Sequence, residues 1–415
     1  MSDVKRVFQT GTFDVQNYGD LLFPLIADFR LKPWNISILP VSPTGFDTGW
    51  QDTVPSVPFR AMLNEADAID AVMIGGGNIV HAGPSYLRDY EVAGLTGRAY
   101  AELWLGASLI GAIRNIPVVW NAPGVPMAMT KELETAGATL ALRAADYVSV
   151  RDRSSADLLG KHDAMNSAVV PDTVIELARM WPRASLAPTF KALIERKLAP
   201  PEARFLAIHV KERSLDLTHA ELATAIEQFA GSRGLTPLLI AIGPCHDDHL
   251  TARRIARHLK LPHVLLDDPV GLAEIASAIA NATLYLGSSM HGYITGAAYN
   301  VPGAIVARPL LDKFAGFLAH IDRPQDLAVD WRMAFELGAA RLAEPPRQCI
   351  PDALFEMLDT HWARIRAVVA KPGALMAKRT RFLRHYVKNG VEASGGAWLF
   401  DPLYNAPRRT GWRGS

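Results

Sequence analysis

A histidine and an arginine with the chemistry of a catalytic site stand where predicted strands give way to predicted helices. His291 follows the strand-ending segment Leu286-Gly287-Ser288-Ser289-Met290, where an imidazole can donate or accept a proton near neutral pH beside helix N–H groups that can hold an anion. Arg151 ends another strand, and its guanidinium can bind a carboxylate or phosphate through two hydrogen bonds. The alternatives are a structural histidine and a surface ion pair, with Asp152 or Ser154 capping the following helix.

Two strand ends in the first half can present backbone N–H groups to a ligand. Asn17 and Asp20 lie where a helix starts after the first strand, and capping of that helix by Asp20 is the alternative. Gly75-Gly76-Gly77-Asn78 directly follows a strand, so that the backbone can approach a ligand or form an anion-binding nest, with a tight turn as the strong alternative. The spacing matches neither the dinucleotide-binding fingerprint nor the Walker loop.

The second half brings three nitrogen-bearing side chains to one strand end, in Ile208-His209-Val210-Lys211-Glu212-Arg213. On a strand, His209, Lys211 and Arg213 share one face, which predicts an anion clamp, although a solvated strand edge has the same pattern. Pro171-Asp172-Thr173 closes another strand, and its aspartate fits a hinge or a helix cap as readily as a catalytic role.

Two segments have suggestive compositions and more ordinary interpretations. Cys245-His246-Asp247-Asp248-His249 resembles a metal site in composition, but adjacent side chains do not easily converge on one ion, so a structural loop is predicted and no metal. The basic stretch 378–388 contains interleaved Phe382, Leu383 and Tyr386 and could touch a membrane surface or an anionic glycan, whereas a solvated helix face is the commoner explanation.

The elements that position these residues follow from an alternation of β-branched runs with longer helical patterns, which predicts βαβ units and parallel sheets. Predicted strands are 4–9, 36–40, 71–74, 118–121, 147–150 and 168–170, and then 205–210, 237–242, 264–266, 283–286 and 304–306. The two series predict an α/β fold of two Rossmann-like domains with parallel sheets facing across a cleft, where ligands bind at the carboxyl ends of the strands.

The predicted borders are residues 1–183 for the N-terminal Rossmann-like domain and 184–345 for the C-terminal one. Residues 346–415 are predicted to form helices and an irregular tail that pack back on the N-terminal domain. At 415 residues the chain is longer than one hydrophobic core usually supports, which favours this division.

Composition narrows the classes of partner. The net charge is +1 without long like-charge blocks, which argues against nucleic acid as a partner and favours a discrete molecule. Two distant cysteines, Cys245 and Cys349, suit a reducing compartment. No signal core and no bilayer-spanning stretch are recognised, so a cytoplasmic protein with at most peripheral membrane contact is predicted.

Taken in order, five short motifs resemble the polysaccharide pyruvyl transferase family over roughly residues 8–320. The motifs are Asn17-Tyr18-Gly19-Asp20, Gly75-Gly76-Gly77-Asn78, Val148-Ser149-Val150-Arg151-Asp152-Arg153-Ser154, Pro171-Asp172 and Ser288-Ser289-Met290-His291-Gly292. The resemblance continues at Pro302 and in the stretch 313–317. It implies a GT-B-like arrangement, phosphoenolpyruvate as donor, no metal or nucleotide cofactor, and transfer of a pyruvyl group as a ketal to two hydroxyls of one sugar.

By this resemblance His291 is the general acid that protonates the donor's methylene carbon, and Arg151 binds its phosphate or carboxylate. A donor with two anionic groups needs several cations and N–H groups, and Lys211 and Arg213 could complete that clamp. The expected substrate-binding set is Asn17, Asp20, Gly75, Gly76, Gly77, Asn78, Lys211, Arg213, Ser288, Ser289 and Gly292. The sequence departs from the family where many members carry Arg-Leu, because Ser289-Met290 stands there and removes one cation.

The expected function is pyruvyl transfer to a saccharide or lipid-linked saccharide in cell-surface or exopolysaccharide synthesis, in the cytoplasm or at the inner face of the membrane. A nucleotide-sugar-dependent GT-B glycosyltransferase would use the same architecture. However, residues 292–307 contain no Asp or Glu to hold ribose hydroxyls, which favours a donor without ribose. A catalytically silent glycan-binding protein is the third possibility, and the oligomeric state stays open.

Overall fold

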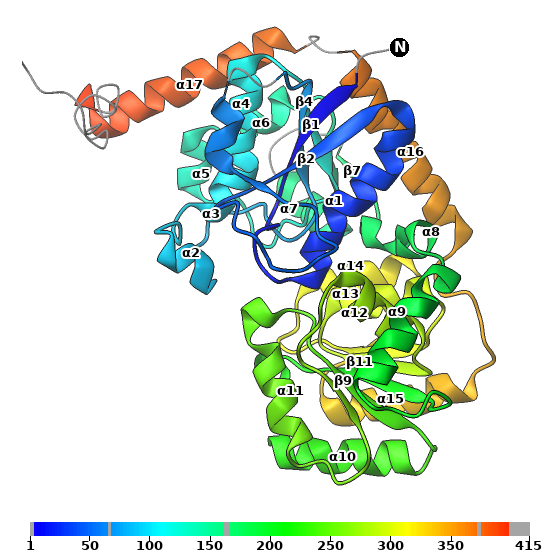
Figure 1. The fold of residues 1–415 in the computed structure, drawn as a ribbon. Coiled ribbons are helices and arrows are strands. Elements are labelled where there is room, and N and C mark those ends of the chain that lie inside the picture. The colour runs from blue at the N-terminus through cyan, green and yellow to red at the C-terminus, as the bar shows by residue number, and fades with distance from the viewer. Residues whose placement is uncertain (1–3, 65–67, 161–166, 372–374, 398–415) are drawn as a thin grey trace, which may run out of the picture.

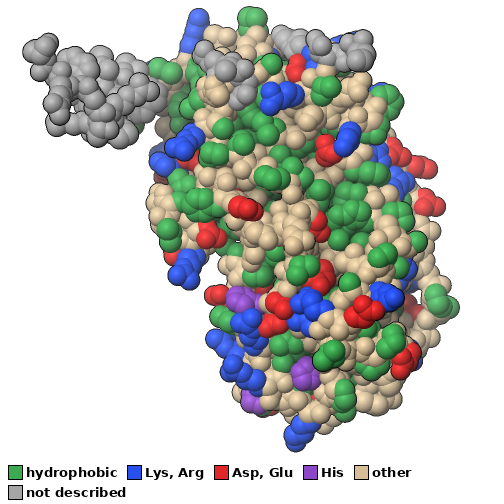
Figure 2. All heavy atoms as spheres, in the orientation of Figure 1, with side chains coloured by type: hydrophobic (Ala, Val, Ile, Leu, Met, Phe, Trp, Pro, Cys, Tyr) green, Lys and Arg blue, Asp and Glu red, His purple; other side chains and the backbone are tan. Residues whose placement is uncertain are grey.

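The computed structural model describes residues 4–64, 68–160, 167–371 and 375–397 of the chain. It shows two Rossmann-like domains, each a parallel sheet between layers of helices, stacked one above the other (Figure 1). Acidic and basic side chains are interspersed over the face shown in Figure 2, in keeping with a sequence that has no long like-charge blocks.

The N-terminal sheet has five parallel strands in the order β3-β2-β1-β4-β5. Its strands are β1 (Lys5–Thr10), β2 (Ile36–Ser42), β3 (Val57–Pro58), β4 (Ala71–Gly75) and β5 (Val118–Asn121). A short parallel pair, β6 (Ser149–Val150) and β7 (Ala168–Val169), continues beside β5 through a bridge between Val119 and Tyr147. The central strands are apolar runs buried on both faces, as is usual for a parallel sheet covered by helices.

The C-terminal sheet has six parallel strands in the order β10-β9-β8-β11-β12-β13. Its strands are β8 (Phe205–His209), β9 (Thr236–Ile240), β10 (Val264–Leu266), β11 (Leu284–Gly287), β12 (Gly303–Val306) and β13 (Leu327–Ala328).

Helices cover both sheets. In the N-terminal domain they are α1 (Tyr18–Leu31), α2 (Arg88–Val92), α3 (Ala99–Ala101), the π-helical turn η3 (Glu102–Gly106), α4 (Ala107–Arg114), α5 (Lys131–Ala136), α6 (Ala138–Ala144), α7 (Arg153–Gly160) and α8 (Leu177–Met180). In the C-terminal domain they are α9 (Arg183–Arg196), α10 (His219–Gly231), α11 (Asp248–Ala256), α12 (Leu272–Ala280), α13 (Met290–Ala298), α14 (Asp312–His320) and α15 (Trp331–Ala343). Short 3₁₀ turns are η1 (Lys32–Trp34), η2 (Phe59–Leu63), η4 (Thr173–Glu176), η5 (Glu212–Ser214), η6 (Pro244–His246) and η7 (Pro324–Asp326).

The chain then returns from the C-terminal to the N-terminal domain. Helices α16 (Asp352–Ala370) and α17 (Met376–Ser394) pack on α1 and on α4, α5 and α6, respectively (Figure 1). One face of α17 buries Phe382 and Arg379, whose Nη2 donates to Asp146 Oδ2 at 2.6 Å. The basic stretch 378–388 is therefore solvated on one side only, in contrast to a wholly exposed helix. The irregular tail expected at the C-terminus falls on residues 398–415, outside the described residues.

A shared core holds the two domains together. One cluster of buried apolar residues runs from β1 and α1 through α12 and α13 to α16, and two further clusters lie on the opposite faces of the two sheets. The alternating pattern located all eleven predicted strands, but it missed the two-residue strands β3 and β13 and placed the start of β6 two residues early. The exact domain borders stay predictions. No helix in the described ranges is long and apolar enough to cross a membrane.

Both sheets reverse their strand order next to their first strand. The reversal lies between β1 and β4 in the N-terminal sheet and between β8 and β11 in the C-terminal sheet. Loops that leave neighbouring strands in opposite directions open a crevice there, which is where open α/β sheets bind ligands. The loops after these four strands carry most of the residues singled out in the sequence.

Candidate active site

A cavity of about 310 Å³ lies between the carboxyl ends of the two sheets and is lined from both domains. Nine of the expected site residues contribute to its wall: Asn17, Asp20, Gly77, Asn78, Arg151, Lys211, Arg213, Ser289 and His291. We call this cavity the cationic pocket, because the Arg and Lys side chains on its wall outnumber the carboxylates.

His291 lies in the first turn of α13, as expected. The hydroxyl of Ser289 caps this helix by accepting from the backbone N–H of Gly292 at 3.3 Å. A Cβ at position 19 would lie 1.7 Å from Nδ1 of His291, so Gly19 makes room for the ring. Phe23 contacts the ring edge to face. The imidazole is thus held in one orientation with its side chain 13% exposed.

The other ring nitrogen, Nε2, faces a buried carboxylate at 3.4 Å, Oδ2 of Asp172. Neither of these two atoms has a hydrogen-bond partner among the described residues, whereas Oδ1 of Asp172 accepts from Val174 N at 3.0 Å and starts η4. Burial alone would raise the pKa of Asp172. The neighbouring His291 and Arg151 lower it by more than burial raises it, so the pKa lies below its usual value. The carboxylate is therefore ionised at neutral pH and can orient a protonated His291.

Arg151 follows β6 and is only 5% exposed, and its Nε lies 3.5 Å from Oδ2 of Asp152, so the ion pair considered for it is buried and does not lie at the surface. Its Nη2 donates to Oδ1 of Asn78 at 2.9 Å, while Nε has no hydrogen-bond partner among the described residues. A Cβ at Gly124 would lie 2.6 Å from the guanidinium carbon, so a larger residue would displace it. The neighbouring Asp152 caps α7 by accepting from Ser155 N at 2.7 Å.

Asn17 and Asp20 form a polar wall of the pocket from α1. Asn17 is the residue before the first turn, and its Nδ2 donates to Oδ2 of Asp20 at 2.8 Å. Thr12 Oγ1 donates to the same oxygen at 2.7 Å. Asp20 therefore does not cap α1, because it is the third helical residue and its carboxylate is engaged by two side chains.

Four residues expected to bind substrate do not line the pocket. Gly76 has a φ of +81° and contacts the Phe23 ring, and Gly75 lies in β4 against Asn121, so these two serve the turn. Ser288 accepts a hydrogen bond from Lys211 N at 2.8 Å, and a Cβ at Gly292 would lie 2.2 Å from the Tyr285 hydroxyl oxygen. Packing and backbone geometry require the three glycines, whereas Ser288 supplies a hydroxyl that fixes the backbone of Lys211.

The expectation that His209, Lys211 and Arg213 share a strand face is wrong, because β8 ends at His209. His209 is completely buried, with Nε2 2.9 Å from Oδ2 of Asp248 inside the C-terminal domain. The chain then turns into η5, which brings Lys211 and Arg213 to the pocket. Burial and the charge of Arg213 lower the pKa of Lys211.

The sequence motifs did not single out Lys313, which reaches the pocket from the start of α14. Burial, followed by the charges of Lys211 and Arg151, holds its pKa well below the ordinary lysine value. The only signal was the continuation of the family resemblance into the stretch 313–317. Thr12, His81 and His246 also line the pocket. Four cationic side chains thus surround a small cavity, which suits a multiply charged anion.

The side chains of the segment Cys245-His246-Asp247-Asp248-His249 do not converge on one site. Oδ2 of Asp248 accepts from the backbone N–H groups of Ile242 and Gly243 as well as facing His209. His246 lines the cationic pocket, whereas Cys245, Asp247 and His249 line a different cavity. In the described ranges no group of three His, Cys, Asp or Glu side chains is arranged to hold a metal ion.

Comparison with known sequences identifies one family. The profile described as polysaccharide pyruvyl transferase matches residues 17–308, which contain every candidate residue except Lys313 and Thr12. No curated protein matches the chain.

Similar solved structures share the fold. UDP-GlcNAc 2-epimerase from Methanocaldococcus jannaschii has a TM-score of 0.54 at 12% identity, covering 86% of this chain and 99% of that one. The Rickettsia bellii UDP-N-acetylglucosamine 2-epimerase has a TM-score of 0.53 at 12% identity, covering 94% and 99%. The Neisseria meningitidis enzyme bound to UDP-GlcNAc has a TM-score of 0.50 at 11% identity, covering 92% and 100%. At these identities the likeness concerns the GT-B-like arrangement of two Rossmann-like domains.

Proposed function

The chain belongs to the polysaccharide pyruvyl transferase family, and we propose that it transfers the pyruvyl group of phosphoenolpyruvate to two hydroxyls of a saccharide, as a ketal. The acceptor would be a saccharide or lipid-linked saccharide of a cell-surface or exopolysaccharide pathway. The proposed place of action is the cytoplasm, including the inner face of the membrane if the acceptor is lipid-linked.

The observation that carries this proposal is the convergence of Arg151, Lys211, Arg213 and Lys313 on a pocket that also holds His291. At neutral pH the donor has a phosphate of about −2 charge and a carboxylate beside it. Nε of Arg151 faces Asp152 at 3.5 Å but makes no hydrogen bond, so the guanidinium can donate to one of these groups, while the cations from the C-terminal domain can bind the other. The family's arginine before the histidine is Ser289 here, and Lys313 supplies a cation to the same pocket.

His291 is placed to act as the acid. Its Nε2 is buried and faces Asp172 at 3.4 Å, so Asp172 holds the ring through Nε2 and the proton to be transferred is the one on Nδ1. Donation of that proton to the methylene carbon of the donor leaves positive charge on C2. A sugar hydroxyl adds to C2, the C2–O bond to phosphate breaks, and a second hydroxyl of the sugar adds to the same carbon. One hydroxyl proton returns to His291 and the other leaves with phosphate, so that phosphoenolpyruvate and a diol give a ketal and inorganic phosphate.

A nucleotide-sugar donor is the rival, since several structures of this fold bear the name UDP-GlcNAc 2-epimerase. Against it, α13 contains no carboxylate to bind ribose hydroxyls. A small pocket dominated by cations also suits a compact trianion better than a nucleotide with its base.

Isothermal titration of the protein with phosphoenolpyruvate, UDP and UDP-GlcNAc tests the proposal. We expect saturable binding of phosphoenolpyruvate and none of comparable affinity for the nucleotides. The variant Arg151→Ala should lose about 2–4 kcal/mol of donor binding, as expected for removal of a buried charge partner. Arg153→Ala is the matched control, because Arg153 lies two residues away, is exposed and does not line the pocket. Preferential binding of the nucleotides would favour a glycosyltransferase over a pyruvyl transferase. Binding of none of the three compounds would favour the glycan-binding protein.

A further inference from the structure

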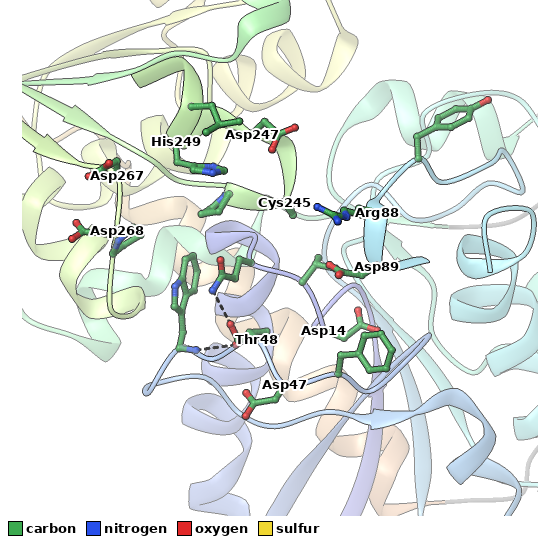
Figure 3. A pocket seen from close by; sticks show the side chains of 18 residues that line it. Asp14, Asp47, Thr48, Arg88, Asp89, Cys245, Asp247, His249, Asp267 and Asp268 are labelled. Atoms are coloured by element: carbon green, nitrogen blue, oxygen red, sulfur yellow. Dashed lines mark hydrogen bonds between the residues drawn. The ribbon is translucent and has the colours of Figure 1, made fainter. Parts of the chain in front are cut away.

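A second and larger cavity, of about 1100 Å³, opens between the two domains beside the cationic pocket (Figure 3). Asp14, Asp47, Thr48, Arg88 and Asp89 contribute to it from the N-terminal domain, and the segment around Cys245 to His249 from the C-terminal domain. Pockets for single small molecules usually have about 300–1000 Å³. The size therefore suits a ligand of several sugar rings.

The large cavity and the cationic pocket are immediate neighbours. Gln16 lines the cavity and the next residue, Asn17, lines the pocket. On the other side Cys245 lines the cavity and His246 lines the pocket. The N–H of Cys245 donates to the carbonyl of Gln16 at 3.3 Å, so this contact between the domains lies where the two spaces adjoin. A chain of sugars in the cavity would have its end at the donor.

The charge of the large cavity is opposite to that of the pocket. Among the described residues, six aspartates contribute to its wall, and Arg88 is the only Lys or Arg that does so. Three of the aspartates are engaged: Asp14 by Thr44 and Tyr90, Asp267 by Arg253, and Asp268 by Arg196 and Lys197. Asp47, Asp89 and Asp247, labelled in Figure 3, are exposed and form no ion pair with any described residue, and Asp47 accepts one hydrogen bond from the backbone N–H of Gly49.

Aromatic side chains accompany these carboxylates. Tyr86 is 78% exposed and Phe46 is 48% exposed, while Trp50 forms part of the wall with most of its ring buried. Large exposed aromatic side chains around a cavity mark a binding site more often than a bare surface. Sugar rings have an apolar C–H face that packs on aromatic rings and hydroxyls that donate to carboxylates, which is the combination present here.

We propose that this cavity is the subsite for the acceptor and that it takes a saccharide of more than one ring that is neutral or carries amino groups. The three exposed carboxylates disfavour an acidic saccharide, because like charges placed together across an interface repel. The same separation of charge keeps the anionic donor in the cationic pocket. The assignment of the cavity as an acceptor subsite rests on the proposed pyruvyl transfer, whereas its preference for sugars of this charge can be measured without turnover.

Binding of three tetrasaccharides of matched length provides the test: neutral chitotetraose, its cationic de-N-acetylated form, and anionic tetragalacturonate. By isothermal titration we expect the neutral and cationic tetramers to bind at least about tenfold more tightly than the anionic one, since tenfold corresponds to 1.4 kcal/mol. Tyr86→Ala should weaken binding of the neutral tetramer about threefold or more. The double change Asp89→Asn and Asp247→Asn should weaken binding of the cationic tetramer by a similar factor. It should also reduce the difference in affinity between the cationic and the anionic tetramer.

Glu91→Gln is the control, because Glu91 is an exposed carboxylate on the same short helix as Asp89 but does not line the cavity. Tetragalacturonate binding as tightly as chitotetraose, no binding of the neutral and cationic tetramers, or binding unaffected by the cavity variants would each overturn the inference. Phosphoenolpyruvate titrated into the same variants should bind as in the unaltered protein. Saccharide binding with no phosphoenolpyruvate binding would refute the pyruvyl transfer and leave the saccharide site standing.

Discussion

At the scale of single residues, the pairing of His291 with Asp172 decides how a proton can be handled. Nε2 and Oδ2 lie 3.4 Å apart and have no other described partner, while Gly19 and Phe23 hold the ring in place. A carboxylate so placed orients the imidazole and stabilises its charged form, as in other acid–base pairs. Under the proposed reaction this makes Asp172 a positioning residue for His291.

His291→Ala should lower turnover by about 10²- to 10⁴-fold while phosphoenolpyruvate still binds, because the proton donor is lost and the cations remain. Steady-state kinetics and titration of the variant separate the two effects. Equal turnover in the variant and the unaltered protein would remove the acid role from His291.

Asp172→Asn should lower turnover about tenfold or more and shift the pH dependence of the rate, because an amide cannot balance the imidazolium charge. The pH–rate profile is the informative measurement, since a purely structural effect would lower the rate equally at every pH. An unchanged profile would confine Asp172 to its role in starting η4.

Lys211 and Lys313 lead to a prediction about protons. Both pKa values are lowered by burial and by neighbouring cations, so an anion entering the pocket should raise both pKa values and proton uptake should accompany binding. Affinity for phosphoenolpyruvate should accordingly fall as the pH rises toward the ordinary lysine pKa of about 10.4.

Titrations at about pH 8.5, where phosphate is fully ionised, in buffers of different ionisation enthalpy measure this uptake directly. Lys313→Met should reduce the number of protons taken up. Release of protons, or no exchange with buffer, would contradict the charge arrangement around the donor.

At the scale of elements, α16 is held against the N-terminal sheet by a buried histidine. His361 Nε2 lies 3.0 Å from Asn121 Oδ1 at the end of β5, and its Nδ1 lies 2.9 Å from the Tyr147 hydroxyl oxygen. Burial, with a smaller contribution from Arg30, lowers the pKa of His361 to about 3. The histidine is therefore neutral when the protein is folded and charged below about pH 6.5 when it is unfolded.

Because the unfolded chain binds this proton and the folded chain does not, the stability contributed by a neutral His361 is present above about pH 6.5 and is lost as the pH falls toward 3. His361→Gln should flatten the fall in unfolding free energy over this range by up to about 1.4 kcal/mol per pH unit. Urea unfolding at several pH values measures the slope, and His258→Gln, an exposed change, serves as the control. A variant with the same slope as the unaltered protein would show that His361 is charged in the fold.

At the scale of the whole molecule, the two domains together build the cationic pocket. Arg151 comes from the N-terminal domain and Lys211 and Lys313 from the C-terminal domain, so one donor molecule would bridge both. The domains are already joined by the Tyr18 hydroxyl to Thr295 and by Asp52, which accepts from two N–H groups at the start of α12.

Phosphoenolpyruvate at about 100 times its dissociation constant should stabilise the folded protein by about 2.7 kcal/mol. Arg151→Ala and Lys211→Met should each remove most of the resulting rise in Tm, because each deletes one domain's share of the contact. Scanning calorimetry with and without donor shows both effects. Full stabilisation in either variant would mean that one domain alone holds the donor.

The sequence alone determined the class of fold and the positions of the main polar loops. Short β-branched runs and helical patterns depend on near neighbours in the chain, and so they located the strands and showed that Arg151 and His291 follow strand ends. The sequence also showed small residues in these loops, but it did not show which contacts make them necessary. Gly75, Gly76 and Gly292 have no side chain because Asn121, Phe23 and Tyr285 lie against them, and Ser288 accepts a hydrogen bond from the backbone of Lys211. None of those contacts can be read from a local pattern.

Only the tertiary structure decided which polar side chains meet. It turned His209 into the core toward Asp248, added Lys313 to the cations, and set Asp172 against His291 from a distant part of the chain. It also opened the acidic cavity beside the pocket, from loops that belong to both domains. Strand patterns are set by the burial of neighbouring residues, whereas convergence of side chains depends on the order of strands in each sheet and on how the two sheets pack, and both are long-range properties.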